Sequence, residues 1–156
     1  MSSPALDQLA KNGVSHIVHA YDPEDLDDGI TYGEAVAAAV GVSPDRLYKT
    51  LVAEVDGDPV VAFVPVDGRL STKALARAAG GKRAKLADPA DAERLTGYVT
   101  GGISPFGRRR SIPAFVDVSI QSHDTVLVSA GRRGLQVEVS VADLLAETGA
   151  TVADLR

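Results

Sequence analysis

Two stretches of the sequence carry residues that could take part in chemistry. The first is LYKTLVA, in which Lys49 stands among residues typical of a β-strand. Strand alternation places Leu47, Lys49, Leu51 and Ala53 on one face. A lysine on such an apolar face is either an edge-strand charge or an amine directed into a pocket. In a pocket, burial would lower the pKa of the amine, and an anionic ligand would oppose that shift.

The second stretch is TGYVTGGISPFGRRR, residues 96–110, which combines four glycines, a proline and three consecutive arginines. Its glycine spacing is that of a phosphate-binding loop, but Arg108 and Arg109 stand where the lysine and the hydroxyl residue would be. Pro105 also removes an amide from such a cradle. Nucleotide hydrolysis is therefore not expected. The loop is either a tight turn that needs glycine geometry, or a set of N–H donors for a carbonyl oxygen that gains negative charge.

Other chemical constellations are weak. The chain has 0 Cys, which excludes a disulfide, a thiolate metal site and a cysteine nucleophile. The acidic stretch DPEDLDD lacks the calcium-loop pattern, so we expect neither a metal nor another cofactor. Tyr21 and Tyr32 flank this stretch. They are either rim residues of the core or aromatic groups that stack on a ligand.

Length and composition are typical of a globular protein. The 156 residues suit a single domain over 1–156, with 45% hydrophobic and 24% charged residues. No apolar run is long enough to span a bilayer, and the N-terminus lacks a signal segment. The expected location is the cytoplasm, and no membrane contact is expected.

Charge is distributed unevenly along the chain. The formal net charge is -5; residues 1–67 carry 12 acidic and 3 basic residues, whereas residues 68–156 carry 9 acidic and 13 basic ones. The basic residues cluster within 82–85, 108–110 and 132–133. If these clusters met on one face, they could hold phosphates; otherwise they are solvated loop charges.

The elements that would position these residues are capped helices and hairpin-like strands. Helix signals cover 4–13, 31–41, 71–81, 88–97 and 140–149. Strand patterns cover 15–21, a hairpin over 47–66 that turns at Asp-Gly-Asp, and 113–120, 124–131 and 135–140. Because hairpins predominate, we predict an α/β (α+β) fold. Its sheet would be mixed and largely antiparallel, curled or closed into a barrel, and surrounded by helices.

Three segments together resemble the YbaK/EbsC family, which is related to the editing domain of bacterial prolyl-tRNA synthetases. They are YKTLV with Lys49, TGYVTGGISPFG, and VLVSAGRRGLQVEV, and they occur in the family's order and spacing. The resemblance covers nearly the whole chain and is nearest to the Cys-tRNA(Pro)/Cys-tRNA(Cys) deacylase type. It implies that family's fold and a trans-editing activity, in which a free-standing domain cleaves the ester between a wrong amino acid and its tRNA.

The resemblance also implies roles for particular residues. Lys49 matches the family's essential lysine. The family's G-x-x-x-P loop matches Gly101, Gly102, Ile103, Ser104 and Pro105, and pocket positions match Tyr21, Tyr32, Thr50, Ser129 and Gly131. Many relatives have a double glycine after the serine, where this chain has Ala130-Gly131. The added methyl group bears on the turn and the pocket width, and so on the choice of amino acid.

The implied mechanism divides the work between a side chain and the loop. Lys49 would anchor the 3′-terminal adenosine or its phosphate, or polarise the ester, and loop amides would stabilise the tetrahedral oxyanion. The attacking group would be the thiol of a cysteinyl substrate or water. The tRNA backbone would be held by Arg108, Arg109, Arg110, Arg132 and Arg133, with prolyl-tRNA synthetase as a partner in selecting the tRNA.

Two other interpretations stay open. One is editing of another small misacylated residue on the same scaffold, such as Ala-tRNA(Pro). The other is a non-catalytic module that binds RNA or a synthetase.

Overall fold

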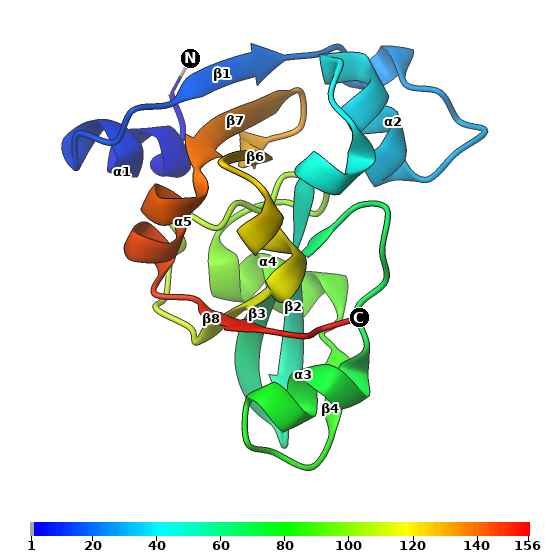
Figure 1. Cartoon of the computed structure of the whole chain (residues 1–156), viewed down its shortest axis with the longest axis vertical. Helices are drawn as coiled ribbons and strands as arrows, with labels where there is room; N and C mark the ends of the chain where they lie inside the picture. The colour runs from blue at the N-terminus through cyan, green and yellow to red at the C-terminus, as the bar shows by residue number, and fades with distance from the viewer. Residues whose placement is uncertain (1) are drawn as a thin grey trace.

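The computed structural model describes residues 2–156, which form a mixed α/β fold (Figure 1). The helices are α1 (Pro4–Lys11), α2 (Tyr32–Val40), α3 (Thr72–Ala78), α4 (Pro89–Thr96) and α5 (Val141–Thr148). The strands are β1 (Ile17–Ala20), β2 (Tyr48–Val55), β3 (Asp58–Pro65), β4 (Ala84–Leu86), β5 (Ala114–Asp117), β6 (Thr125–Arg132), β7 (Leu135–Ser140) and β8 (Thr151–Ala153). Over residues 2–156, the structure has no helix that is both long and apolar enough for a membrane span.

Local capping explains where most helices begin. In α1, α2, α3 and α5 a side-chain oxygen just before the helix accepts an N–H bond from the first turn; these residues are Ser3, Thr31, Ser71 and Ser140. The cap expected at Asp88 forms no side-chain hydrogen bond. Pro89 at the first helical position still supplies the backbone angle that a helix start needs.

The strands form two sheets. One is three-stranded and antiparallel in the order β1-β7-β6, and the other is five-stranded in the order β4-β2-β3-β5-β8. In the larger sheet β2 is antiparallel to β3 and β4, whereas the β3–β5 and β5–β8 pairs are parallel. The predicted mixed, largely antiparallel arrangement is confirmed. The barrel alternative is not formed within residues 2–156, because a single β-bridge, Leu47 to Leu127, links the two sheets.

Some strand boundaries differ from the prediction. The strand expected over 113–120 ends at Asp117, because this carboxylate accepts the N–H of Ser119 and starts a 3₁₀ turn. The three-residue strands β4 and β8 were not expected; both are held by pairing with distant strands.

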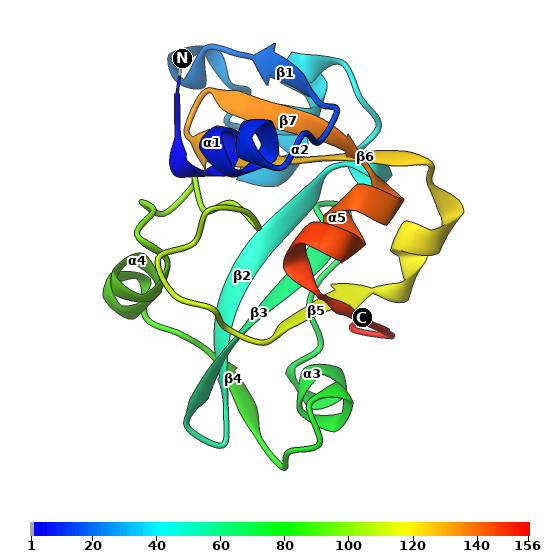
Figure 2. The same ribbon diagram turned by 90° about the vertical axis from the view of Figure 1, so that its left-hand side faces the viewer.

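Three apolar clusters hold the elements together. The largest lies between the sheets and includes residues of α1 and α5. A second packs α3 against the larger sheet, and a third packs α2 over Leu47 and Leu127. Figure 2 shows β2 running from the three-stranded sheet toward the end of the molecule that carries α3 and β4. On one face of β2, therefore, α2 covers one end and α3 the other, with Lys49 between them.

Candidate functional site

A cleft of about 1140 Å³ follows β2 between the two sheets. Seven of the residues singled out in the sequence line it: Tyr32, Lys49, Thr50, Gly101, Ile103, Ser129 and Arg133. They come from α2, β2, the glycine loop, β6 and the β6–β7 turn, so residues up to 101 positions apart meet in one cavity. A cleft of this size is sufficient for a nucleotide-sized ligand.

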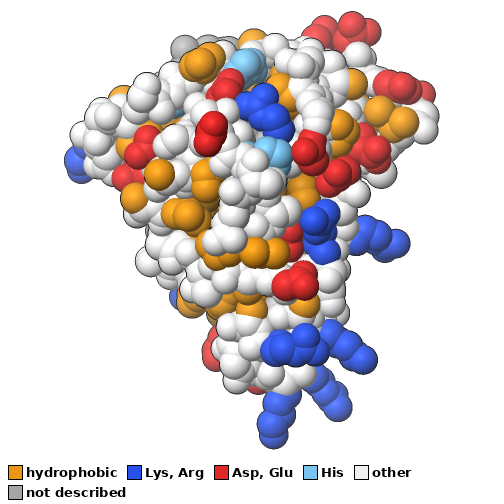
Figure 3. Space-filling view, in the orientation of Figure 1, with side chains coloured by type: hydrophobic (Ala, Val, Ile, Leu, Met, Phe, Trp, Pro, Cys, Tyr) orange, Lys and Arg blue, Asp and Glu red, His pale blue; other side chains and the backbone are white. Residues whose placement is uncertain are grey.

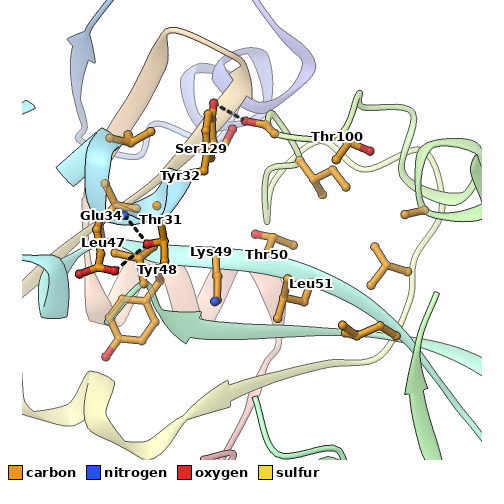
Figure 4. A pocket seen from close by; sticks show the side chains of 18 of the residues that line it. Thr31, Tyr32, Glu34, Leu47, Tyr48, Lys49, Thr50, Leu51, Thr100 and Ser129 are labelled. Carbon is orange, nitrogen blue, oxygen red and sulfur yellow. Dashed lines mark hydrogen bonds between the residues drawn. The ribbon is translucent and has the colours of Figure 1, made fainter. Parts of the chain in front are cut away.

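The cleft exists because β2 and β6 diverge after their single bridge. Leu47 and Leu127 pair in parallel. Lys49 and Ser129 each lie two residues further along their strands. Their side chains therefore project from the same strand faces as those of Leu47 and Leu127, respectively. Beyond the bridge the strands separate, and the gap leaves room for a ligand beside Lys49. Figure 4 shows Lys49 and Thr50 on opposite sides of the β2 ribbon, with Tyr32 and Thr100 on the neighbouring segments.

The backbone of β2 is open toward this cleft. The carbonyl of Leu47 accepts the N–H of Val66, so Leu47, Lys49 and Leu51 bond toward β3. Thr50 faces the other edge, as does Val52, whose carbonyl accepts the N–H of Ala87. Within residues 2–156 no backbone group pairs with Thr50 on that edge, because β4 begins to pair only at Ala53. The cleft thus contains a free N–H and a free C=O on an exposed strand edge.

Lys49 is a half-buried amine that lacks a direct partner. No hydrogen bond or ion pair is recorded for its ammonium group across residues 2–156. Burial lowers the pKa of Lys49, and the positive charge of Arg69 lowers this pKa further, while Glu34 opposes the shift. An anion in the cleft would supply the missing counter-charge, so the lysine is positioned to bind one.

Two buried polar atoms in the cleft wall also lack hydrogen-bond partners among residues 2–156. They are Thr50 Oγ1 and Gln136 Oε1, and both residues line the cleft. Gln136 is only 4% exposed and lies opposite Ser129 in the β6–β7 pair. Ser129 Oγ accepts the N–H of Gly131 at 3.1 Å, which leaves its hydroxyl proton available. Because an unpaired buried polar group costs about 1–3 kcal/mol, this wall suits a ligand with polar groups of its own.

Aromatic side chains form one rim of the cleft. The Tyr32 ring lies 5.4 Å from the Arg133 guanidinium carbon, within cation–π range. The Tyr32 hydroxyl is 3.4 Å from both the Tyr21 hydroxyl and the Gly101 carbonyl, which are long contacts. Burial raises the pKa of Tyr21, and the adjacent Tyr32 hydroxyl raises it further. This rim connects α2 to the glycine loop across the cleft mouth.

The glycine loop uses its bare backbone for shape. Gly101 has φ 88°, which strongly favours glycine. Gly102 has no unusual φ, but a Cβ there would lie 3.1 Å from backbone atoms of Arg132 and Arg133. The Gly102 N–H donates to the Val99 carbonyl, so it is not free for a substrate. Over residues 2–156 the N–H groups of Gly101 and Ile103 have no recorded acceptor.

Ser104, Pro105 and Gly131, which were predicted to contact substrate, lie outside the cleft lining, as do Tyr21 and Gly102. Ser104 is fully buried, and its Oγ accepts the Phe106 N–H. Pro105 is also buried. Gly131 is needed for its φ of 96° and for the Tyr98 ring beside it. These residues therefore shape the loop and the turn behind the cleft wall.

The Ala130 substitution is accommodated without strain. Ala130 has no positive φ and is fully buried in the cluster between the sheets. Its carbonyl accepts the hydroxyl proton of Ser3, which ties β6 to the start of α1. The extra methyl group points into the core, so it does not narrow the cleft.

The predicted arginine clusters do not form one surface. The guanidinium of Arg108 is half-buried and donates to the carbonyls of Pro105 and Ile112. Arg109 and Arg110 are exposed, whereas Arg133 stacks on Tyr32 at the cleft. Arg132 is exposed beside the β6–β7 turn, outside the cleft lining. The basic cluster within residues 82–85 lies at the end of the molecule that carries α3 and β4, opposite the three-stranded sheet (Figures 1 and 2).

Sequence reasoning missed two residues that shape the site. Gln136 follows the polar alternation of β7 and would be expected at the surface, but it is buried beside Tyr21 and opposite Ser129. Arg69 follows the β2–β3 hairpin, in a position where an arginine is usually solvated, yet it lines the cleft. Among residues 2–156 no three His, Cys, Asp or Glu side chains gather as a metal site.

Comparison with known proteins gives the cleft a family context. Residues 28–146 match the family model of the aminoacyl-tRNA editing domain. A protein of Enterococcus faecalis (strain ATCC 700802 / V583), provisionally named Cys-tRNA(Pro)/Cys-tRNA(Cys) deacylase EbsC, is 36% identical over 123 residues, which are 78% of this chain and 75% of that protein. The Multifunctional Ser/Thr-tRNA deacylase ProXp-y of Escherichia coli (strain K12) is 30% identical over 151 residues, and the match covers 88% of this chain and 90% of that protein.

A solved structure extends the likeness to the fold. It is a crystal structure provisionally described as a trans-editing enzyme for prolyl tRNA synthetase, with a TM-score of 0.82 and 26% identity. The alignment covers 100% of this chain and 98% of that one. The resemblance seen in the sequence is confirmed: the chain belongs to the aminoacyl-tRNA editing domain family.

Proposed function

We propose that this protein is a trans-editing deacylase of misacylated tRNA, with Cys-tRNA(Pro) and Cys-tRNA(Cys) as its substrates. The observation that carries the proposal is the unpartnered Lys49 amine beside the open edge of β2. It offers a positive charge to the anionic 3′ end of a tRNA. The adjacent polar wall offers hydrogen-bond groups to an aminoacyl moiety. The likeness to named deacylases supports the same reaction class.

The chemistry needs an attacking group that the cleft does not supply. In the thiol route, the sulfur of the cysteinyl group attacks its own ester carbonyl carbon. The new C–S bond forms, the bond from that carbon to the ribose oxygen breaks, and the thiol proton ends on that oxygen. A thiolactone and a free tRNA result. In the water route, the water oxygen bonds to the carbonyl carbon, the same bond to the ribose oxygen breaks, and one water proton ends on that oxygen, giving free cysteine and free tRNA.

The protein contributes charge and N–H donors to either route. Lys49 holds the 3′-terminal phosphate or polarises the ester carbonyl. The loop donors are the amides of Gly101 and Ile103, since that of Gly102 bonds within the turn. The Tyr32 ring provides a face on which the terminal adenine stacks. The reaction takes place in the cytoplasm, where prolyl-tRNA synthetase is the partner that produces the misacylated tRNA.

The polar wall favours a polar amino acid over alanine. Thr50 and Gln136 contribute polar side chains to the cleft lining, and such a lining suits a thiol or hydroxyl better than a methyl side chain. This favours Cys, and also Ser or Thr, over Ala-tRNA(Pro). A single panel of substrates separates these possibilities.

The first test is deacylation of Cys-, Ser-, Thr- and Ala-tRNA by wild-type protein and by Lys49→Ala. We expect turnover of Cys-tRNA(Pro) by the wild type and a loss of at least about 10²-fold in Lys49→Ala. Release of the thiolactone, detected by mass spectrometry, identifies the thiol route. A wild type that binds tRNA yet cleaves none of these esters would support the non-catalytic module instead. Full activity of Lys49→Ala would refute the role of the lysine but not the reaction.

A further inference from the structure

The segment 69–87 is the most strongly basic part of the chain. It contains six cationic residues and no acidic one: Arg69, Lys73, Arg77, Lys82, Arg83 and Lys85. It leads from the cleft through α3 and the following turn to β4. In the space-filling view, Lys and Arg side chains gather at the lower end of the molecule, where Figure 1 places α3 and β4 (Figure 3). We call these six side chains the α3–β4 basic surface.

The charges of this surface are available to a partner. All six residues are exposed. Within residues 2–156 the only ion pair recorded for them is Lys85 with Glu54, at 3.6 Å. Asp56 is the other nearby acid, and its two carboxylate oxygens accept the backbone N–H groups of Lys82 and Arg83 at 3.0 Å. That carboxylate therefore neutralises the turn only in part.

The surface is continuous with the cleft at both of its ends. Arg69 lines the cleft at the start of the segment, and its charge acts on Lys49. Leu86 and Ala87 line the cleft at the end of the segment. A ligand bound at Lys49 that extends along the open edge of β2 would therefore pass onto this surface.

We propose that the α3–β4 basic surface binds backbone phosphates of the acceptor stem while the 3′ end lies in the cleft. This inference rests on the proposed tRNA substrate. An RNA fits better than an acidic protein, because Leu86 is the only large apolar side chain exposed on the segment, at 53%. Protein interfaces need a buried apolar centre, whereas phosphate contacts need only spaced cations.

The proposal changes which cations are expected to hold the tRNA. Arg108 is engaged with two carbonyls of its own loop, so it contributes to loop structure. Lys73 and Lys82, by contrast, are exposed and have no recorded partner for their ammonium groups across residues 2–156. The main phosphate contacts are assigned to α3 and β4 rather than to the arginine triplet.

The test compares two double variants that remove equal charge. Lys73→Gln/Lys82→Gln neutralises the basic surface, and Lys11→Gln/Arg94→Gln neutralises two exposed cations outside it. Binding of a non-acylated acceptor-stem minihelix is measured by fluorescence anisotropy over a series of NaCl concentrations. The slope of log affinity against log salt concentration is negative. We expect its magnitude to decrease by about one for each lost phosphate contact, hence by about two in Lys73→Gln/Lys82→Gln. The control variant should keep the wild-type slope. Circular dichroism melting checks that both variants are folded.

Each outcome decides the question. An equal decrease of the salt slope in both variants would mean that only the net charge of the protein matters. An unchanged slope in Lys73→Gln/Lys82→Gln would mean that these two lysines contact no phosphate. Either outcome overturns the proposal. A loss of minihelix affinity seen only when prolyl-tRNA synthetase is added would assign the surface to a protein partner, and this outcome also overturns the proposal. Because the minihelix carries no ester, the result is independent of deacylation. A protein that cleaves no aminoacyl-tRNA can still show the slope change, and an active one can lack it.

Discussion

At the scale of single residues, the site depends on groups that the fold leaves unsatisfied. Lys49 has no counter-ion, and Thr50 Oγ1 and Gln136 Oε1 have no hydrogen-bond partner within residues 2–156. Each of these costs stability in the empty protein. Under the proposed function, a substrate that supplies a counter-charge to Lys49 would recover part of this cost on binding.

Replacing Lys49 should separate activity from stability. Lys49→Met keeps the length of the side chain and removes the half-buried charge. We expect loss of deacylation together with an unchanged or higher melting temperature, because no interaction of the ammonium group is lost. Differential scanning calorimetry and the deacylation assay on one preparation make this comparison. A variant that is inactive because it melts well below the wild type would contradict this account.

The same variant gives a pH dependence with a defined sign. Because the folded protein lowers the pKa of Lys49, its unfolded state binds more protons between the lowered value and the ordinary value of 10.5. The stability penalty of the lysine is fully present below the folded pKa and is lost as the pH rises toward 10.5. The stability advantage of Lys49→Met over wild type should therefore shrink in alkaline solution, as measured by urea unfolding.

At the scale of elements, the glycine loop is held from behind by the β6–β7 turn. The Tyr98 hydroxyl donates to the Phe106 carbonyl, and burial raises the pKa of Tyr98 to about 12. The Tyr98 ring also fills the space over Gly131. These contacts fix the loop ends, so the Gly101 and Ile103 amides keep a constant position relative to Lys49.

Gly102→Ala tests whether this position matters. The new Cβ would lie 3.1 Å from backbone atoms of the β6–β7 turn, so the loop must shift by a few tenths of an ångström. We expect kcat to fall about tenfold, since small misplacements of catalytic groups are costly. Gly29→Ala is the matched control, because the only close contact of its Cβ is the flexible side chain of Asp27. Equal kcat values for the two variants would show that the loop position is not critical.

The elements also show how far the sequence could predict the fold. Helix starts at Ser3, Thr31 and Ser140 are local signals, and so is the Asp56-Gly57 turn of the β2–β3 hairpin. The strands β4 and β8 have three residues each and form only because a distant strand offers an edge. Such pairing leaves no local pattern in the sequence.

The site was predictable to a similar degree. Lys49 and Gly101 were identified from residue type and family resemblance, and both line the cleft, whereas Gly102 lies against the backbone of Arg132 and Arg133. The sequence could not show that Arg108 turns inward, because three adjacent arginines look alike. It also could not show that Gln136 is buried beside Tyr21, since this depends on packing between segments far apart in the chain.

At the scale of the whole molecule, two sheets share one bridge and separate around the cleft. Residues 1–67, which supply α2, β2 and β3, have a net negative charge, whereas residues 68–156 are net positive, with the densest positive charge in α3 and β4 and the turn between them. The chain thus combines an acidic total with a local surface for a polyanion. Net charge alone would have argued against a nucleic-acid ligand.

The open edge of β2 gives the protein a built-in reporter of occupancy. The Lys49 and Leu51 amides bond to β3, whereas the Thr50 amide between them faces the cleft. In the free protein, hydrogen–deuterium exchange followed by NMR should be fast at Thr50 and slow at its two neighbours. A bound aminoacyl end that uses this edge would slow exchange at Thr50 and leave exchange at Lys49 and Leu51 unchanged. A single amide could therefore report whether a minihelix has placed its 3′ terminus in the cleft or rests only on the outer surface.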